Sequence, residues 1–163
     1  MKQPIRIGNG FDVHQFAEGR KLFLGGIEIP FHKGLLGHSD ADVLLHAICD
    51  AMLGALALGD IGKHFPNDDA RFKDIDSKLL LRHVNELINQ YEYEVSNLDA
   101  TLLLENPKIL PFVEKMTEVI SEIINVEPNQ VSIKATTTEK LGFTGREEGV
   151  AAFATVLLTR RNS

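Results

Sequence analysis

The chain has 163 residues, of which 44% are hydrophobic and 25% are charged, a composition typical of one globular domain. It contains no apolar run of the roughly 18 to 20 residues that a membrane-spanning helix needs. The formal net charge of −6 argues against a general nucleic-acid-binding protein, because such proteins present a basic surface to phosphates. We therefore expect a single soluble domain over residues 1–163, with neither a membrane nor a nucleic acid as partner.

The cellular location is predicted from the N-terminus and the cysteine count. The opening residues, MKQPIRIGNGF, contain no apolar core segment and are not rich in Arg and Ser, so no export or organelle signal is expected. Cys49 is the only cysteine and cannot form an intrachain disulfide. Both observations favour a reducing cytoplasm.

Strand and helix patterns alternate along the chain without a strict strand–helix–strand rhythm. In chain order, the patterns predict a strand over 5–16, a hairpin over 20–30, a loop over 32–38, a helix from Ser39 to Gly59, a polar loop over 63–75, a helix over 77–91, a strand over 94–104, a helix over 110–125, a strand over 131–137, a loop over 140–149 and a strand over 150–159. The fold class is therefore predicted to be α+β (α/β mixed), with helices layered on a mixed sheet.

Two of these elements carry further expectations. Ser39 is expected to be the N-cap of the first helix, because Asp42 follows three residues later as in a capping box. The last strand, over 150–159, is apolar enough to be buried on both faces.

Asp12 and His14 are candidate metal ligands in the first strand. Residues two apart on a strand point to the same face, so their side chains should converge while Val13 points away. The alternative is a core histidine bonded to a backbone carbonyl, which an Asp-x-His pair does not exclude.

The first predicted helix adds a polar row at a spacing of four: Asp42, His46 and Asp50. A solvated helix face is the alternative, but such a face normally includes Lys or Arg, and this one has neither. If His46 joins Asp12 and His14, the three ligands suit zinc or a similar transition metal, because magnesium prefers oxygen ligands alone. Three protein ligands leave a fourth position open, which is typical of catalytic sites.

Two further segments suit a phosphorylated ligand. His38 and Ser39 lie at the expected helix N-terminus, where free amides and the helix dipole attract anions, although Ser39 alone could simply cap the helix. Thr136, Thr137 and Thr138 end a strand beside Glu139; hydroxyls donate to phosphate oxygens and a carboxylate can hold Mg²⁺. Ordinary strand propensity also favours threonine there. Beside the candidate zinc site, the two segments support phosphoryl chemistry.

Five motifs resemble one enzyme family. They are GFDVH, GHSDADVLLHA, LGDIGKHFP, NPKIL and KATTTEKLGFTGR, and they occur in the order and spacing of the 2-C-methyl-D-erythritol 2,4-cyclodiphosphate synthase family of the non-mevalonate isoprenoid pathway. The resemblance runs from about Arg6 to the C-terminus. It implies an enzyme in which the 2-phosphate of a CDP-linked methylerythritol attacks the β-phosphorus, releases CMP and closes a cyclic diphosphate.

The resemblance also implies cofactors, assembly and location. One Zn²⁺ per subunit would be bound by Asp12, His14 and His46, and a second divalent cation, Mg²⁺ or Mn²⁺, by Glu139. His38 would position the phosphate and Thr137 would stabilise the transition state, so these two are the implied catalytic residues. A homotrimer with active sites between subunits, in a bacterial cytoplasm, is the implied assembly.

The implied substrate contacts extend over most of the chain. Asp60 and Gly62 match ribose contacts, and residues 104 and 108–110 match the cytosine pocket. Phe143 and Arg146 match a pair of residues near the trimer axis. The full implied set is Asp12, His14, His38, Ser39, Asp60, Gly62, Phe65, Asp69, Leu104, Lys108, Ile109, Leu110, Thr136, Thr137, Thr138, Glu139, Phe143 and Arg146.

Two stretches depart from the family pattern. The sequence FPNDD stands where an FPDTD-type loop is usual, which leaves open whether Asn67, Asp68 or Asp69 faces the substrate. The sequence LENPK replaces a more neutral stretch and places Glu105 near the nucleotide without an explanation. Two other functions stay open: a metal-dependent phosphohydrolase, and a non-catalytic sensor of nucleotides or isoprenoid phosphates on the same fold.

Overall fold

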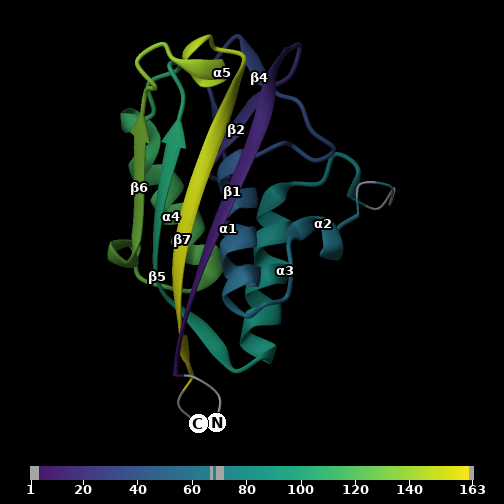
Figure 1. The fold of residues 1–163 in the computed structure, drawn as a ribbon, viewed down its shortest axis with the longest axis vertical. Coiled ribbons are helices and arrows are strands. Elements are labelled where there is room, and N and C mark those ends of the chain that lie inside the picture. The colour runs from purple at the N-terminus through teal and green to yellow at the C-terminus, as the bar shows by residue number, and fades with distance from the viewer. Residues whose placement is uncertain (1–3, 67, 69–71, 162–163) are drawn as a thin grey trace.

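A computed structural model describes residues 4–66, 68 and 72–161. It contains a five-stranded sheet in the order β4-β1-β7-β5-β6 (Figure 1). The strands are β1 (Ile5–Glu18), β4 (Lys33–Leu35), β5 (Tyr93–Leu103), β6 (Val131–Thr136) and β7 (Gly149–Arg160). β5 and β6 are parallel and the other neighbours are antiparallel, which confirms the predicted mixed sheet. β2 (Leu22–Leu24) and β3 (Ile27–Ile29) form a separate hairpin.

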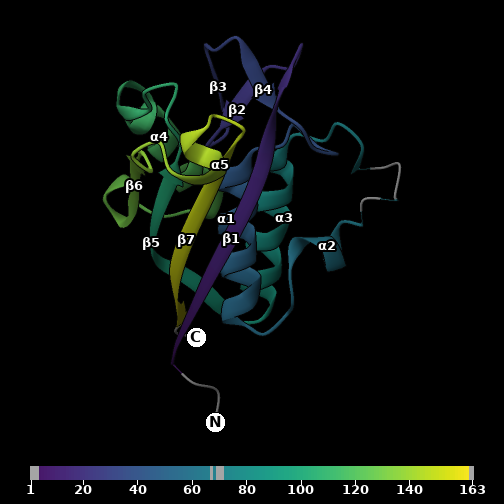
Figure 2. The same ribbon diagram turned by 45° about the horizontal axis from the view of Figure 1, so that its top comes forward.

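Three longer helices cover one face of the sheet, as the two ribbon views show (Figures 1 and 2). α1 (Val43–Ala55) packs on β1 and β7, α3 (Ser77–Gln90) packs on α1, and α4 (Val113–Ile124) packs on β6. Among the described residues, short helices lie in the connections: α2 (Ile61–His64), η2 (Leu110–Phe112), η3 (Pro128–Gln130) and α5 (Gly142–Gly145). The described residues thus form one mixed α+β domain. None of their helices is long and apolar enough to cross a membrane.

Two glycines of β1 allow α1 to lie directly against the strand. A Cβ at Gly8 would be 2.0 Å from the carbonyl oxygen of Ala51, and a Cβ at Gly10 would be 2.0 Å from that of Ala47. Any side chain at either position would therefore push the helix away. Because residues two apart share a face, Asp12 and His14 follow the glycines on the same side and point toward α1. The strand thus fixes how closely α1 approaches these two side chains.

The other face of the sheet carries exposed apolar side chains. Ile7 is 70% exposed, Phe11 50% and Phe153 45%, and the rings of the two phenylalanines lie 4.6 Å apart between centroids. Because α1, α3 and α4 lie on one side, β7 is covered on one face only. The expected burial of the final strand on both faces is therefore not met within a single chain, and burial of the second face by a neighbouring subunit stays a prediction.

The first long helix begins later than predicted. Its N-cap is Asp42, whose side chain accepts a hydrogen bond from the Leu45 amide, and the helix starts at Val43. Ala41 has a φ of 59°, which is incompatible with a right-handed helix starting at Ser39. The Ser39 hydroxyl instead accepts the Ala41 amide and lies beside His46. The prediction of Ser39 as N-cap is wrong.

Three segments expected to be loops contain short regular elements. β4 lies within 32–38 and pairs with the end of β1, while α2 and α5 lie in or beside the predicted loops 63–75 and 140–149. Such short elements are stabilised by contacts with neighbouring segments, and their sequences are too short to show a helix or strand periodicity. The longer elements agree with the predicted ones to within a few residues.

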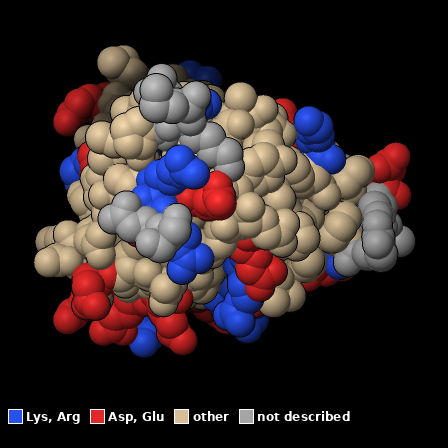
Figure 3. Space-filling model, turned by 90° about the horizontal axis from the view of Figure 1, so that it is seen from below, with Lys and Arg blue, Asp and Glu red and all other residues tan. Residues whose placement is uncertain are grey.

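Asp12, His14 and the turn that follows Thr136 lie near one end of the sheet, and Pro4 and Arg160 lie near the opposite end. His14 pairs with Val150, near the start of β7, whereas Ile5 pairs with Thr159 at its end. Figure 3 views the molecule from below relative to Figure 1, and acidic and basic side chains are interspersed on this face.

Candidate metal centre and substrate cavities

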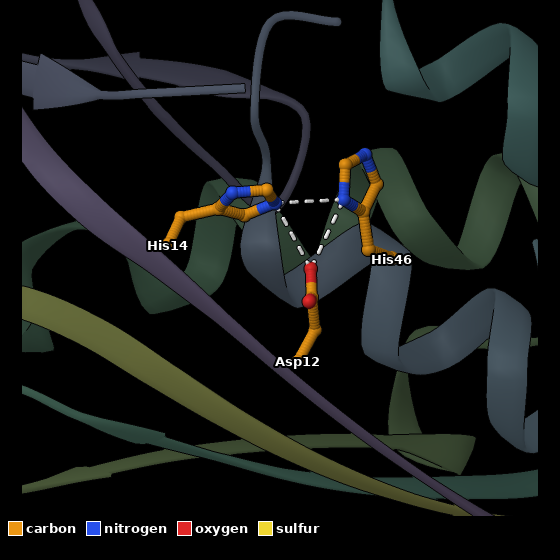
Figure 4. A group of neighbouring side chains, drawn as sticks. All are labelled: Asp12, His14 and His46. Carbon is orange, nitrogen blue, oxygen red and sulfur yellow. Dashed lines mark hydrogen bonds and ion pairs between the residues drawn. The ribbon is translucent and has the colours of Figure 1, made fainter. Parts of the chain in front are cut away.

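Asp12 and His14 of β1 and His46 of α1 form a compact triangle of metal-ligating atoms (Figure 4). Asp12 Oδ2 lies 3.0 Å from His14 Nε2 and 3.1 Å from His46 Nδ1, and the two nitrogens are 3.0 Å apart. Ligands at about 2.0 to 2.1 Å from a tetrahedral zinc ion would be separated by only slightly more. The predicted convergence of these three residues is confirmed.

The remaining nitrogen of each imidazole has a partner elsewhere. His14 Nδ1 donates to the Leu36 carbonyl oxygen at 2.9 Å. His46 Nε2 lies 3.0 Å from the Ser77 hydroxyl and 3.1 Å from the Ser39 hydroxyl. With protons on these outer nitrogens, the inner lone pairs of both rings face each other and the Asp12 carboxylate. Such an arrangement calls for a positive charge between them, which a ring proton or a divalent metal ion can supply, so the residues fit a divalent metal ion.

The charges of the triad are strongly coupled. Burial alone would raise the pKa of Asp12, but hydrogen bonds from His14 and His46 outweigh burial and hold it below its ordinary value. Burial alone would lower the pKa of His14, but the Asp12 carboxylate raises it above the ordinary value. Asp12 is therefore an anion, as a metal ligand must be.

Ser77 and Asp40 support His46 from the outer side of the ring. Ser77 is fully buried, and its hydroxyl donates to Asp40 Oδ1 while its amide donates to Asp40 Oδ2. The Ser77 oxygen is thereby left to accept the His46 Nε2 proton. The sequence analysis predicted neither of these supporting roles. The one available signal was the position of Ser77 at the start of the predicted helix over 77–91.

The polar row of α1 is not a solvated face, so that alternative is wrong. Asp42 is fully buried and accepts the amides of Gly25 and Gly26, which fixes the β2–β3 turn. Burial raises the pKa of Asp42 to about 6. Asp50 accepts the amide of Ile61 at 2.7 Å and so holds the start of α2. Only His46 of this row joins the metal triad.

A cavity of about 250 Å³ opens above the triad. Besides the three ligands, its lining includes His38, Ser39, Gly62, Phe65 and several apolar side chains. His38 Nε2 is buried and has no hydrogen-bond partner within the described residues. An unpaired buried nitrogen is costly, so this atom suits a polar ligand in the cavity.

The predicted ribose contacts are only partly placed at this cavity. Gly62 lines it, while Asp60 caps α2 by accepting the Lys63 amide. Asp69 lies outside the described residues.

A second cavity, of about 420 Å³, lies at the ends of β5 and β6. It contains the predicted cytosine and phosphate residues Leu104, Lys108, Ile109, Leu110, Thr136 and Thr137. Thr138 and Glu139 follow in the next turn and are not part of the lining. This cavity shares no lining residue with the metal cavity.

The last predicted pair, Phe143 and Arg146, lines neither of these two cavities. Phe143 lines an apolar hollow of about 430 Å³ together with Phe11 and Phe153 on the bare face of the sheet. Arg146 is exposed and paired with Glu148, at 2.9 Å from Nε to Oε1. One chain therefore holds the predicted substrate residues at three separate places.

A mixed α+β domain in which two histidines and a carboxylate converge beside an open cavity is typical of metal-dependent enzymes. Residues 5–159 match the model of the YgbB family, and the chain belongs to this family. A relative from Geobacillus sp. (strain WCH70), curated as 2-C-methyl-D-erythritol 2,4-cyclodiphosphate synthase, is 61% identical over 96% of this chain and 99% of its own.

Solved structures have the same fold. The bifunctional IspDF of Campylobacter jejuni matches with a TM-score of 0.93 and 42% identity, over 97% of this chain and 43% of its own. This chain therefore spans less than half of that protein. IspF of Plasmodium falciparum, solved as a CDP complex, matches with a TM-score of 0.87 and 35% identity, over 99% of this chain and 100% of its own.

Proposed function

We propose that this chain converts CDP-methylerythritol 2-phosphate into 2-C-methyl-D-erythritol 2,4-cyclodiphosphate with release of CMP, in isoprenoid precursor biosynthesis. The observation that carries the proposal is the 61% identity, over nearly the full length of both chains, with a curated synthase of that name. The Asp12, His14 and His46 triad at an open cavity supports it independently. The bacterial relatives and the free, buried Cys49 favour a cytoplasmic enzyme.

The reaction brings several negative charges together, so alignment and charge neutralisation are its main requirements. The attacking phosphate is already an anion and needs no base. A divalent ion on the triad would supply positive charge and a fixed template for the phosphates. His38 Nε2 and the Ser39 hydroxyl would bind phosphate oxygens beside it, and Thr137 would donate its hydroxyl to the reacting group. The apolar walls around Phe65 and Phe72 would keep water from the phosphorus.

The proposed metals are Zn²⁺ at the triad and Mg²⁺ or Mn²⁺ at Glu139. Two imidazoles and one carboxylate are a ligand set that favours zinc over magnesium, whereas a lone carboxylate beside phosphates favours a hard cation. Glu139→Gln should retain its zinc and lose the activity that depends on added Mg²⁺. Wild-type Mg²⁺-dependent turnover in this variant, measured beside metal analysis, would show that Glu139 has another role.

A homotrimer with shared active sites is part of the proposal. The metal cavity and the second cavity belong to opposite parts of the sheet, since β1 and β6 are separated by β7 and β5. At the usual strand spacing this is a distance of about 14 Å. A neighbouring subunit could bring its second cavity to the metal cavity, and the bare apolar face offers a surface for such contacts.

The test is incubation of the purified protein with the CDP-linked substrate, Zn²⁺ and Mg²⁺, with products identified by ³¹P NMR. We expect cyclic diphosphate and CMP in equal amounts. Ring-free hydrolysis products would instead indicate a phosphohydrolase, and unchanged substrate that nevertheless binds would indicate a sensor.

A further inference from the structure

We infer that Glu105 is a positioning residue that joins the base loop (residues 104–110) to the threonine turn (residues 136–140). The inference rests on the proposed function, in which the base loop contacts the nucleobase and the threonine turn contacts the phosphates. It assigns a role to the acidic side chain for which the sequence offers no explanation.

The two segments start side by side. The parallel pairing of β5 and β6 ends with Leu103 opposite Thr136, and the Leu104 amide then donates to the Thr136 carbonyl oxygen at 3.1 Å. Beyond this point there is no further strand pairing. The half-buried Glu105 connects the two segments there, because its Oε1 accepts hydrogen bonds from the amides of Thr138 and Lys140, each at 3.1 Å.

The threonine turn needs this support because its backbone is unusual. Glu139 has a φ of 52° and Lys140 a φ of 64°, so two consecutive residues with side chains adopt the left-handed region. Each such residue is disfavoured relative to a right-handed or extended one. The turn also has internal hydrogen bonds: the Leu141 amide donates to the Thr138 carbonyl oxygen at 2.9 Å, and the Thr138 hydroxyl donates to the Leu141 carbonyl oxygen at 2.7 Å. The Glu139 amide donates to the Thr137 hydroxyl at 3.4 Å. The bonds to Glu105 come from outside the turn and fix its position relative to the base loop.

A second side chain of the base loop makes a similar connection. Asn106 Nδ2 donates to Glu147 Oε1 at 3.0 Å, and Glu147 also has a left-handed φ, of 55°. Glu105 and Asn106 therefore both connect the base loop to the segment that follows β6. Both residues belong to the stretch LENPK, one of the two stretches that depart from the family pattern.

This arrangement has a consequence for binding. Thr137 lines the second cavity with Leu104, and Glu139 lies two residues further on. A nucleobase that fits the base loop would thus find the phosphate-binding groups already in place. Loss of the connection should weaken substrate binding and the response to the second cation more than it slows the chemical step.

The geometry allows the hydrogen bonding of Glu105 to be tested separately from its negative charge. Both amide bonds go to the same oxygen, Oε1, so the single carbonyl oxygen of Gln can accept both. Met has a similar length and no acceptor at that position. Glu105→Gln and Glu105→Met are therefore a matched pair of variants.

The experiment measures KM and kcat for the CDP-linked substrate, the Mg²⁺ concentration for half-maximal rate, and CDP binding by calorimetry. E105Q should remain within about twofold of the wild type in all of them. E105M should raise KM and the CDP dissociation constant by about tenfold or more, with a smaller change in kcat, because two amide bonds to a charged oxygen are lost. Zinc content and thermal unfolding serve as controls for folding.

A measurement on the wild type alone keeps the inference testable if E105M does not fold. The Thr138 and Lys140 amides should exchange slowly with solvent although they lie in a surface turn, and this result does not depend on which substrate the enzyme uses. Rapid exchange of both amides would overturn the inference. So would wild-type binding by E105M, or a defect in E105Q as large as that in E105M, since the negative charge would then be the essential feature. A wild-type enzyme that does not cyclise the substrate would contradict the proposed function instead.

Discussion

Ser77 lies between the candidate metal ligand His46 and the carboxylate of Asp40. Metal-bound histidines usually donate their outer nitrogen proton to a carboxylate, a carbonyl or water, which fixes the ring and makes it a better ligand. Here the Ser77 hydroxyl lies between the two groups: it accepts the His46 Nε2 proton and donates its own proton to Asp40. The orientation of His46 therefore depends on a residue from another helix, α3.

Ser77→Ala should weaken zinc binding about 10- to 100-fold, the range found when such supporting residues are removed. Competition with a chelator of known affinity measures the change, and Co²⁺ substitution should show an altered visible spectrum. Ser121→Ala is the matched control, because Ser121 is buried in α4 and its hydroxyl donates to the Glu118 carbonyl oxygen of its own helix. Equal zinc affinities in the two variants would contradict the role of Ser77.

Asp50 predicts a pH dependence of stability. Burial raises its pKa, and the charge of nearby Asp60 adds to this effect, while the bond from the Ile61 amide opposes it. The folded protein thus holds the Asp50 proton more tightly than the unfolded chain does. The stabilisation from this proton is complete below the ordinary value of 3.8 and is lost as the pH rises through the folded value.

Asp50→Asn keeps an oxygen for the Ile61 amide and removes the ionisable group. Its stability relative to the wild type should therefore increase as the pH rises from about 4 toward neutrality. Urea unfolding of metal-free protein at several pH values measures this difference. Asp99→Asn should show a smaller trend of opposite sign, because Lys134 lowers the pKa of Asp99 on the surface.

At the scale of elements, the contact between β1 and α1 controls the metal centre. Gly10→Ala would place a methyl group 2.0 Å from the Ala47 carbonyl oxygen, so α1 would have to move. We expect a loss of about 3 kcal/mol or more in the free energy of unfolding. Zinc affinity should also fall, because His46 moves with α1.

Gly54→Ala provides the control within the same helix. The nearest atom to a Cβ there is the Asn9 carbonyl oxygen at 3.7 Å, an ordinary contact. Alanine should therefore stabilise the helix by about 0.5 to 1 kcal/mol. Denaturant unfolding and zinc analysis of both variants test the pair, and a Gly10→Ala protein with wild-type zinc affinity would contradict the coupling.

The long elements could be predicted from the sequence because their periodicity is local. The metal triad could also be predicted, since Asp12 and His14 share a strand face by their spacing of two and His46 lies on a helix with a polar row. The start of α1 could not, because Ser39 and Asp42 are both good capping residues. The left-handed φ of Ala41 decides between them.

Contacts between distant segments had no signal in the sequence. Ser77 reaches His46 only through the packing of α3 on α1, and Glu105 reaches the threonine turn only through the pairing of β5 with β6. The bare face of β7 was missed for a similar reason. An apolar strand has the same sequence pattern whether a helix or another subunit covers it.

At the scale of the whole molecule, the shared site of the proposed trimer predicts complementation. His46→Ala and Thr137→Ala damage different cavities, so each variant alone should be inactive. In a random equal mixture about a quarter of shared sites would combine an intact metal cavity with an intact second cavity from the neighbour. Co-expression should restore roughly that fraction of wild-type activity. Mixed trimers that form but stay inactive would place the whole site within one chain.

Pro4 and Arg160, near the two ends of the described chain, lie together at the end of the sheet away from the candidate metal centre (Figure 1). β1 and β7 are antiparallel neighbours, and the Arg160 amide donates to the Pro4 carbonyl oxygen at 2.9 Å. This gives the molecule a natural point of attachment. A purification tag, an immobilising linker or a second catalytic domain joined at either end would extend away from both cavities. A circular permutant joined there and opened at Gly19, whose surroundings are empty, would keep β1 and β7 paired and the metal ligands in place.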